Sequence, residues 1–286
     1  MSPTRVLITR DPAAAEELAA LLRERGLQPC ASPMLEAQLP ADPAALRRLL
    51  LREAAAPERP TWLCVTSATT VRAFDAVSDG ADWGAELATA RRGGLLRVAA
   101  VGGATARALR QRGVDVDLLP SGASSAEGML AAWPSEDTGT DAAAPRALVP
   151  VSALGSGTLE DGLRRKGYDV RRVTAYEMVP VPAQRPVRRR DPAAQTAVPG
   201  PDVPELDPET ARAACARGEV AAVVVTAPSR AAALLENAAP RADVAWIAIG
   251  EPTARALRQR GASPVTATHP TSEALAAAVT TALARH

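Results

Sequence analysis

A nine-residue segment occurs twice in the chain without a single change, first as Thr105–Gly113 and later as Thr253–Gly261. Each copy comes shortly after an apolar run that ends in glycine, Val98–Gly102 or Trp246–Gly250. Repetition of a strand-like run, a glycine and a helix start indicates two copies of one supersecondary unit. The chain is therefore predicted to contain two similar α/β domains that arose by internal duplication.

Alternation of strand-like and helix-like segments predicts the kind of sheet. Short runs rich in Val, Ile and Leu, such as Val6–Ile8 and Val223–Val225, are typical of strands buried on both faces. Helical periodicity lies between such runs: Glu16–Arg25 places its leucines on one face and stops before Gly26. The alternation favours parallel sheets with helices on both sides.

Two extended segments interrupt this alternation at corresponding places in the repeat. They are Cys30–Glu36 and Val173–Val179, and we expect them to form a two-stranded crossover between the domains. The first domain is then predicted to hold residues 1–33 and 179–286, and the inserted second domain residues 36–174.

A proline-rich stretch, residues about 183–204, is predicted to be a flexible surface insertion because proline prevents regular elements there. It contains the triplet Arg188–Arg190, which could contact an acidic ligand or could be a solvated run of charge. The segment Ser135–Ala144 is predicted to be a second, shorter loop.

Composition excludes several classes of function. A formal net charge of +1 over 286 residues argues against attraction to nucleic acid or to a membrane surface. No apolar run approaches the roughly 18 residues of a membrane span, and Val6–Ile8 is too short for a signal-peptide core. We therefore expect a cytoplasmic protein.

The residues that usually hold metals or nucleotides are scattered or absent. The 3 cysteines form no CxxC pair, and neither of the 2 histidines has a ligand or triad partner nearby in sequence. The Gly155–Gly157 segment lacks the third glycine of a dinucleotide fingerprint, because position 160 is Glu160. The sequence thus predicts no metal site and no cofactor.

Two turns combine a strand end, a glycine and a helix start. In these turns, Gly102 precedes Thr105 and Gly250 precedes Thr253. The free backbone N–H groups of a first helical turn can bind a carboxylate or phosphate. The competing interpretation is that Thr105 and Thr253 merely cap or start their helices.

Further candidates for binding follow other predicted strands. They are Thr66, Ser67, Thr226, Ser229 and Arg10. Side chains at the carboxyl ends of parallel strands line the usual ligand crevice of such folds. For the hydroxyl residues the alternative is helix capping, and for Arg10 it is a surface ion pair.

Tyr176 is a candidate hydrogen-bond or proton donor, because it lies in one of the two extended segments and the chain has only 2 tyrosines. The alternative is an aromatic side chain that packs the connection between domains.

The order of these motifs resembles the uroporphyrinogen-III synthase family. The resemblance runs from about Arg5 to Leu283, apart from the proline-rich stretch, and it depends on five short motifs. These are Val6–Arg10, Val65–Ser67, Val101–Ala106, Val173–Glu177 and Ile249–Ala254.

The resemblance implies a monomeric lyase of heme biosynthesis that needs no cofactor and has its active site in a cleft between two domains. Its substrate is hydroxymethylbilane, a linear tetrapyrrole with eight carboxylates, which closes unaided to the uninverted isomer. The enzyme directs loss of the hydroxyl group, attack at the substituted end of ring D, a spiro intermediate and reattachment of ring D in inverted orientation.

The resemblance also implies roles for individual residues. Tyr176 matches a tyrosine proposed to assist departure of the hydroxyl group, and Thr105 and Thr253 match threonines of the cleft. Ala227 stands where many members carry serine, so no side-chain contact is expected there. A hypothesis from another class is a two-lobed binding protein that holds an anionic small molecule without converting it.

Overall fold

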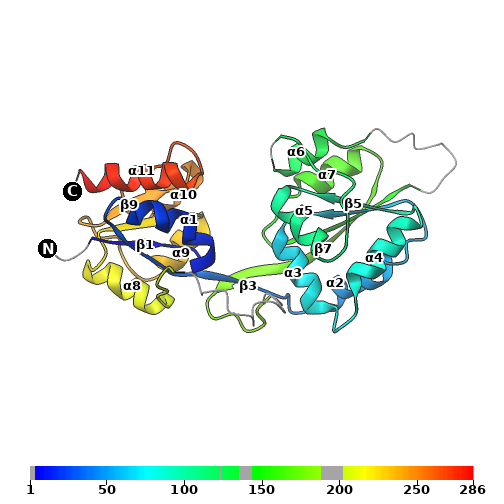
Figure 1. Cartoon of the computed structure of the whole chain (residues 1–286), viewed down its shortest axis with the longest axis horizontal. Coiled ribbons are helices and arrows are strands. Elements are labelled where there is room, and N and C mark those ends of the chain that lie inside the picture. The colour runs from blue at the N-terminus through cyan, green and yellow to red at the C-terminus, as the bar shows by residue number, and fades with distance from the viewer. Residues whose placement is uncertain (1–3, 123, 135–143, 188–201, 286) are drawn as a thin grey trace. The chain divides into compact units, whose positions relative to one another are not determined.

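The computed structural model describes residues 4–122, 124–134, 144–187 and 202–285. These residues divide into two compact units (Figure 1). The first unit holds the described residues within 1–36, 180–182 and 192–286, and the second holds those within 37–179 and 183–191. Each unit contains one five-stranded sheet. The prediction of an α/β protein with two parallel sheets is confirmed.

The sheet of the first unit has the strand order β10-β9-β8-β1-β2, and every adjacent pair is parallel. Its strands are β1 (Arg5–Ile8), β2 (Gln28–Ala31), β8 (Ala222–Val225), β9 (Ala245–Ala248) and β10 (Val265–Thr266). The central strands are apolar throughout because both faces are covered.

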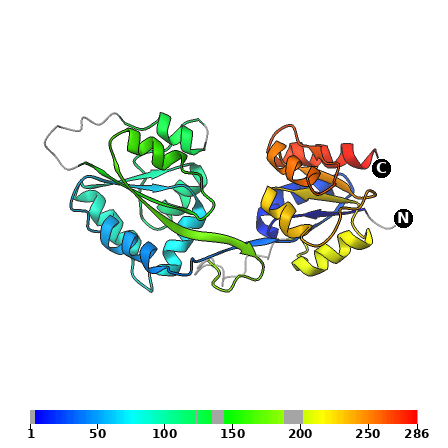
Figure 2. The ribbon, with the colours of Figure 1, turned by 180° about the vertical axis from the view of Figure 1, so that it is seen from behind.

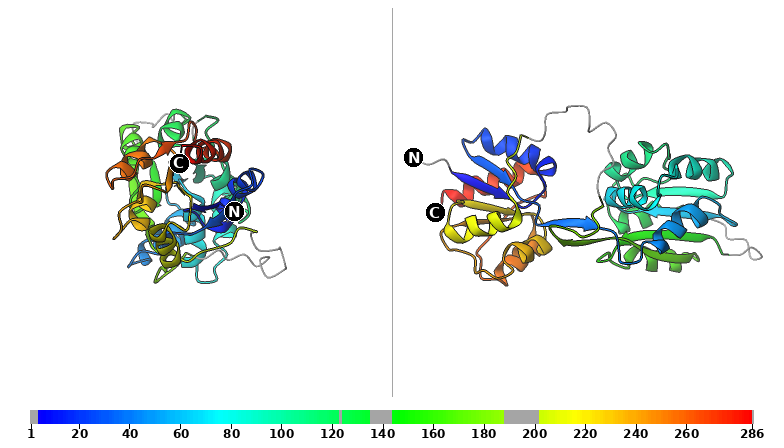
Figure 3. Two further views of the ribbon diagram at one scale, coloured as in Figure 1. Left: turned by 90° about the vertical axis from the view of Figure 1, so that its left-hand side faces the viewer. Right: turned by 90° about the horizontal axis from the view of Figure 1, so that it is seen from below.

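Two layers of helices cover that sheet, and Figure 3 shows the strands between them. The layers are formed by α1 (Pro12–Arg23) and α11 (Ser272–Leu283) on one face, and by α8 (Pro208–Arg217), α9 (Pro228–Leu234) and α10 (Glu251–Arg258) on the other. Successive residues of a strand therefore lie in different cores. Ile8 and Val224 pack with α1 and α11, whereas Leu7 and Val223 pack with α8, α9 and α10.

The sheet of the second unit has the order β3-β7-β6-β4-β5. Its strands are β3 (Leu35–Gln38), β4 (Thr61–Val65), β5 (Leu96–Ala100), β6 (Arg146–Ser152) and β7 (Asp169–Pro180). The pairs β4–β5, β4–β6 and β6–β7 are parallel.

Helices again cover both faces of this second sheet (Figure 2). One layer consists of α2 (Ala44–Arg48), the π-helix η1 (Leu49–Ala54), α3 (Ala68–Val77), α4 (Trp83–Arg92) and α5 (Gly103–Arg110). The other layer consists of α6 (Ala126–Ala131) and α7 (Thr158–Arg165).

The first predicted helix begins earlier than its leucine pattern indicates. Helix α1 starts at Pro12 because the Asp11 side chain accepts a hydrogen bond from the backbone N–H of Ala14 at 3.0 Å. It ends before Gly26, whose φ of 74° lies in the left-handed region that glycine adopts without strain.

The repeated nonapeptide has the same local structure in both units. It forms most of α5 in the second unit and of α10 in the first, and its last residues, Gly113 and Gly261, have φ values of 76° and 89°. The residue after each glycine donates its backbone N–H to the leucine carbonyl five residues earlier, at 3.1 Å in both cases.

The predicted segment Cys30–Glu36 is two strands rather than one. Strand β2 ends at Ala31 in the first sheet, and β3 begins at Leu35 as an edge strand of the second. The intervening residues include Met34, which is fully buried in a core of the first unit, so this part of the chain packs instead of extending.

The prediction of a flexible insertion over residues 183–204 is wrong at both of its ends. Val187 and Val203 are buried, and the backbone N–H of Val187 donates to the carbonyl of Ala37 at 2.8 Å. Pro204 accepts a backbone hydrogen bond from Ala31 at 2.9 Å. Apolar valines beside the prolines explain the difference, because their burial stabilises an ordered path. The triplet Arg188–Arg190 and all but Ala144 of the second predicted loop lie outside the described residues.

Candidate functional site

The predicted binding residues lie in two groups, each at the carboxyl ends of strands in one parallel sheet. Such edges are where ligands bind in α/β folds. In the first unit the group is Arg10 after β1, Thr226 and Ser229 after β8, and Gly250 and Thr253 after β9. In the second unit it is Thr66 and Ser67 after β4, Gly102 and Thr105 after β5, and Tyr176 within β7.

Helices α5 and α10 begin without a side-chain cap. Gly102 and Gly250 occupy the N-cap positions in extended conformations, and among the described residues neither helix has a side-chain cap hydrogen bond. Thr105 and Thr253 therefore do not cap these helices, and of the alternative interpretation only the position at the helix start applies. Both threonines lie inside the first turn and are buried, with 3% and 2% of their surface exposed.

Uncapped first turns have consequences for ligand binding. The first N–H groups of a helix have no intrahelical acceptor, and they carry partial positive charge. By contrast, the helices that follow β1 and β4 are capped by Asp11 and Ser67. Three eight-residue helices, α5 and α7 in the second unit and α10 in the first, begin at a glycine N-cap without a side-chain cap. In α10 the second residue is Pro252, which has no N–H, and the N–H of Thr253 donates to the carbonyl of Gly250 at 3.1 Å, so this first turn has fewer donors for an anion than that of α5.

The two uncapped turns differ in their surroundings. A Cβ atom placed on Gly102 would lie 2.6 Å from the hydroxyl oxygen of Ser124, whereas one placed on Gly250 would meet nothing closer than 4.0 Å. Ser124 therefore adds a hydroxyl group beside the start of α5. The sequence did not point to Ser124, because it lies in a serine-rich loop far along the chain from β5.

Ser67 has the capping role that was its alternative interpretation. Its hydroxyl oxygen accepts a hydrogen bond from the backbone N–H of Thr69 at 3.0 Å, which starts α3. The hydroxyl proton is still available to a ligand, because capping uses only the oxygen. Thr66 precedes it at the end of β4 and is half-buried.

Thr226 belongs to a hydrogen-bonded group that joins β8 to β1. Its hydroxyl oxygen accepts from Nη1 of Arg230 at 2.9 Å, and its backbone N–H donates to the hydroxyl oxygen of Thr9 at 3.4 Å. The Thr9 hydroxyl in turn donates to the carbonyl of Val224 at 3.0 Å. Sequence analysis missed Arg230 and Thr9, although both are polar residues within two positions of a predicted site residue.

Arg10 makes no ion pair with the described residues, so the interpretation of a surface ion pair is wrong. Burial lowers the pKa of its guanidinium group, and the charges of Asp11 and Glu17 oppose that effect. Burial also lowers the pKa of Arg230, and the positive charge of Arg10 lowers it further. Two half-buried cations therefore act on each other at this edge of the first sheet.

Tyr176 lies opposite Ser152 where the register of β6 and β7 shifts. Its backbone carbonyl accepts from the N–H of Ala153 at 2.9 Å, and its ring packs against the core of the second unit. No described residue forms a hydrogen bond with the phenol hydroxyl group. The ring of Tyr176 is thus packed, and its hydroxyl group is still available to donate a hydrogen bond.

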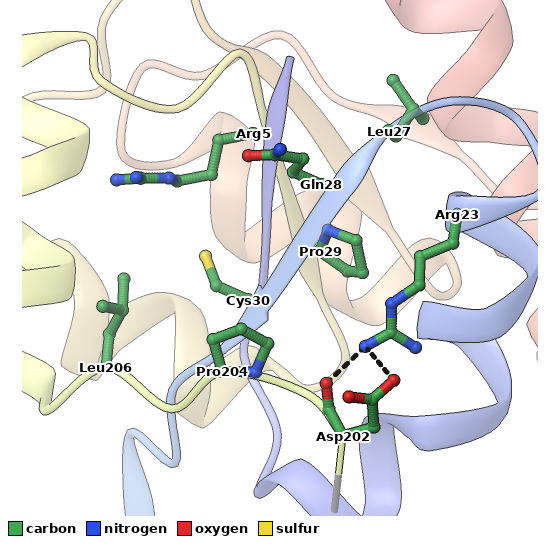
Figure 4. A pocket seen from close by; sticks show the side chains of 9 residues that line it. All are labelled: Arg5, Arg23, Leu27, Gln28, Pro29, Cys30, Asp202, Pro204 and Leu206. Atoms are coloured by element: carbon green, nitrogen blue, oxygen red, sulfur yellow. Dashed lines mark hydrogen bonds and ion pairs between the residues drawn. The ribbon is translucent and has the colours of Figure 1, made fainter. Parts of the chain in front are cut away.

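A pocket of about 490 Å³ in the first unit is separate from these residues (Figure 4). It lies at the amino ends of β1 and β2, beside Arg5 and Gln28, whereas Arg10 follows the carboxyl end of β1. Burial raises the pKa of Cys30 in this pocket to about 11, against a smaller lowering by Arg5. The thiol is therefore protonated at neutral pH and is a poor nucleophile.

Within the described ranges, no group of three or more His, Cys, Asp and Glu side chains is arranged to hold a metal ion. A search of the same residues finds no helix with the length and apolar character needed to cross a membrane.

Comparisons with known proteins agree on one family. The family model described as uroporphyrinogen-III synthase HemD matches residues 16–277. A selenomethionine variant of uroporphyrinogen III synthase from the extremely thermophilic bacterium Thermus thermophilus is similar in fold, with 22% identity, a TM-score of 0.55 and coverage of 99% of this chain and 100% of that one.

Uroporphyrinogen-III synthetase from Helicobacter pylori is similar in fold to the same degree. Its TM-score is 0.55, at 15% identity and with coverage of 99% of this chain and 100% of that one. No curated protein sequence matches the chain.

Proposed function

The chain belongs to the uroporphyrinogen-III synthase family, and we propose that its strand-end residues carry out that family's reaction. The family consists of cyclising lyases that need no cofactor and act in heme and porphyrin biosynthesis. Hydroxymethylbilane loses its hydroxyl group as water and closes to uroporphyrinogen III with ring D inverted. The alternative of a non-catalytic binding protein is not favoured by the family match.

The observation that supports the site best is the pair of uncapped first turns, at α5 and α10. We propose that each binds a carboxylate of the substrate through backbone N–H groups, with a hydroxyl group from Thr105 or Thr253 beside it. Charge-assisted hydrogen bonds of this kind are the strong ones. The identical segment begins at the third residue of each helix, which supports an equivalent role for Thr105 and Thr253; the residues before it differ, Gly103 and Ala104 in α5 against Glu251 and Pro252 in α10.

The remaining hydroxyl groups extend these two anion sites. Thr66 and Ser67 follow the strand next to β5, and Thr226 and Ser229 follow the strand next to β9. We propose that they donate hydrogen bonds to carboxylates or pyrrole substituents of the same substrate. Arg10 adds a positive charge to the group in the first unit.

We assign Tyr176 the role of hydrogen-bond donor to the departing hydroxyl group. Its phenol has no partner in the described part of the chain, so it is free to donate when substrate binds. The substrate closes unaided, so the enzyme needs mainly to hold one conformation and stabilise developing charge. A set of hydroxyl and backbone donors is sufficient for that task.

We propose that the two compact units are domains that arose by duplication, with β3 and β7 as the crossover between them. The identical nonapeptide, its matching glycine turns and two sheets of five strands support this origin. The proposed boundaries are residues 1–33 with 179–286 for one domain and 36–174 for the other. The division at Glu36 and Pro180 in the structure supports boundaries close to these.

We further propose that the protein acts as a cytoplasmic monomer, without nucleic acid or membrane partners. Its 3 cysteines are free and buried, as is usual in reducing compartments. The large hydrophobic side chains exposed among the described residues are three leucines, Leu95, Leu119 and Leu154. They are separate in sequence and provide no continuous stretch for an interface.

The decisive test is incubation of the purified protein with hydroxymethylbilane and no added metal or nucleotide. After oxidation of the product, chromatography should show the type III isomer. If only the type I isomer appears while the ligand remains bound, the protein is a binding protein and the proposed residue roles are wrong.

A further inference from the structure

Two arginines at the carboxyl edge of the first sheet form no direct ion pair with a described residue, although the charge of Asp11 acts on both and that of Glu17 on Arg10. Arg10 follows β1, and Arg230 lies on α9, which follows the neighbouring strand β8. Neither makes an ion pair with a carboxylate in the part of the chain that the structure describes. Half-buried arginines are normally paired, because removal of an unpaired charge from water is unfavourable.

Several other arginines of this chain are paired with a carboxylate, whereas half-buried Arg72, Arg212 and Arg260 donate to hydroxyl or carbonyl oxygens. Arg91, Arg241 and Arg258 each bind one carboxylate through two nitrogen atoms, from Asp117, Asp243 and Glu251. The pairs of Arg241 and Arg258 lie at exposed positions, where pairing is least necessary, and that of Arg91 is half-buried. Arg10 and Arg230 are half-buried and have only the carboxylates of Asp11 and Glu17 near them, none of them in a direct ion pair, so a bound anion would stabilise both.

The structure holds Arg230 in a defined position. Its Nη1 donates to the hydroxyl oxygen of Thr226 at 2.9 Å, and Thr226 is tied to Thr9 at the end of β1. The Nε of Arg230 is buried and has no hydrogen-bond partner among the residues that the structure describes. A guanidinium group has five N–H donors, so most of those of Arg230 are unused.

The second unit lacks this arrangement. In the repeat, Thr66 corresponds to Thr226, and Thr70 therefore occupies the position of Arg230. Thr70 is fully buried, and its hydroxyl group has no hydrogen-bond partner. The helix after β4, α3, has its own half-buried arginine, Arg72, whose Nη2 donates to the hydroxyl oxygen of Thr69 at 2.8 Å. The two units therefore differ in the position of the cation and in the residue that orients it.

We infer that Arg230, oriented by Thr226 and acting with Arg10, binds one side-chain carboxylate of the anionic substrate and so determines which end of it the first unit holds. The inference rests on the proposed function for its substrate class. An unsymmetrical linear molecule bound by two similar units needs such a difference to bind in one direction. Arg230 is thereby a residue for substrate binding and specificity.

The test compares Arg230→Gln and Arg10→Gln with the control Arg260→Gln. Arg260 is also half-buried in the first unit, but it lies beyond the carboxyl end of α10 and donates to Ala256. Two quantities are measured: KM and kcat with hydroxymethylbilane, and the Kd of uroporphyrin I, a fluorescent octacarboxylate that is not converted.

Loss of a charge-assisted hydrogen bond should raise KM and Kd by about 10- to 100-fold for the first two variants. We expect kcat to change by less than about threefold, because these contacts bind the ground state and the transition state alike. Arg260→Gln should leave all three values unchanged. Arg230→Lys should restore part of the affinity, since it keeps the charge but loses the planar fork.

Thermal stability separates this role from a structural one. Removal of an unpaired cation should leave the melting temperature of Arg230→Gln unchanged or higher. A lower melting temperature with unchanged Kd and KM would mean that Arg230 only supports Thr226, and would overturn the inference. If the wild-type protein binds uroporphyrin I but converts no hydroxymethylbilane, the proposed function fails, whereas weaker binding by the variants would still support the arginine site.

Discussion

The Nε atom of Arg172 lies 2.8 Å from the carboxylate oxygen Oε1 of Glu160, and only 1% of the Glu160 side chain is exposed. Glu160 is on α7 and Arg172 is on β7, so this ion pair joins a helix to the strand that carries Tyr176. Arg172 also donates through Nη2 to the carbonyl of Gly155 at 3.0 Å. The Arg172 side chain therefore holds both α7 and the loop between β6 and α7 against β7.

Substitution of Arg172 by Gln should destabilise the protein, because it leaves a buried carboxylate without its cation. Such a loss is typically about 3–5 kcal/mol, and we expect roughly 2–3 kcal/mol because 40% of the Arg172 side chain is exposed. Urea unfolding would measure the change. Arg165→Gln, an exposed position on the same helix as Glu160, is the control and should stay within about 0.5 kcal/mol. If Arg172→Gln and Arg165→Gln lower the free energy of unfolding equally, the ion pair does not contribute to stability.

Tyr176→Phe removes the phenol hydroxyl group and keeps the packed ring. Loss of a positioned acid lowers rates by about 100- to 10,000-fold in general, and we expect the lower end or less because the substrate is already reactive. The decrease should appear in kcat at saturating substrate, with an unchanged melting temperature. Tyr168→Phe, in a tyrosine that packs edge-on against Trp133, is the control and should retain full turnover. A fall in stability without a fall in kcat would leave Tyr176 as a packing residue.

Thr105→Val and Thr253→Val each remove a hydroxyl group from an uncapped first turn and leave the backbone N–H groups in place. Substrate binding should weaken by roughly 0.5–1.5 kcal/mol, the value of a neutral hydrogen bond, and the effect should appear in KM. Neither threonine caps its helix, so stability should not decrease. Thr89→Val in the exposed part of α4 serves as a control for loss of a helical threonine hydroxyl. Unchanged KM in both variants would restrict the anion sites to the backbone.

Alanine should be tolerated at Gly250 and not at Gly102. Both residues are extended, so backbone strain does not distinguish them, but only at Gly102 would the new Cβ come within 2.6 Å of Ser124. Overpacking of this kind costs about 1–3 kcal/mol, and the exposed loop of Ser124 should keep the loss near the lower value. Thermal denaturation would compare the variants. Ser124→Gly added to Gly102→Ala should restore stability; failure to do so would mean that the clash is not the cause.

Asp117 should make stability depend on pH at the acidic end. Burial tends to raise its pKa, but hydrogen bonds from Arg91 and from the backbone N–H of Val98 outweigh burial and lower the pKa. The folded pKa is thus below the unfolded value of about 3.9, so the stabilisation is complete above that pH and is lost as the pH falls through the folded pKa.

Asp117→Asn should therefore lower the free energy of unfolding at pH 7 by about 1–2 kcal/mol, and the difference should vanish near pH 2. Asp115→Asn is the matched control, because Asp115 lies 3.7 Å from the same arginine and its side chain is 81% exposed. A difference that persists undiminished at pH 2 would contradict this assignment.

Local patterns predicted the elements of the fold more accurately than their ends. The leucines of α1 indicated the helix, but its start depended on the Asp11 cap. The extended character of Cys30–Glu36 was visible, whereas its division into β2 and β3 depended on Met34, which is buried in a core formed by distant helices. Proline content made residues 183–204 look irregular, and the burial of Val187 and Val203 was not evident from it.

The sequence by itself determined the α/β class, the two sheets and the family, because these depend on periodicity and on the order of short motifs along the chain. Only the tertiary structure decided which distant residues meet: Thr226 with Thr9, Ser124 beside Gly102, and Glu160 with Arg172. Each of these relationships joins different elements or depends on the path of a loop. Ion pairs and packing contacts form between residues that are close in space. When two such residues are far apart in the sequence, the spacing of residues along the chain does not predict that they meet.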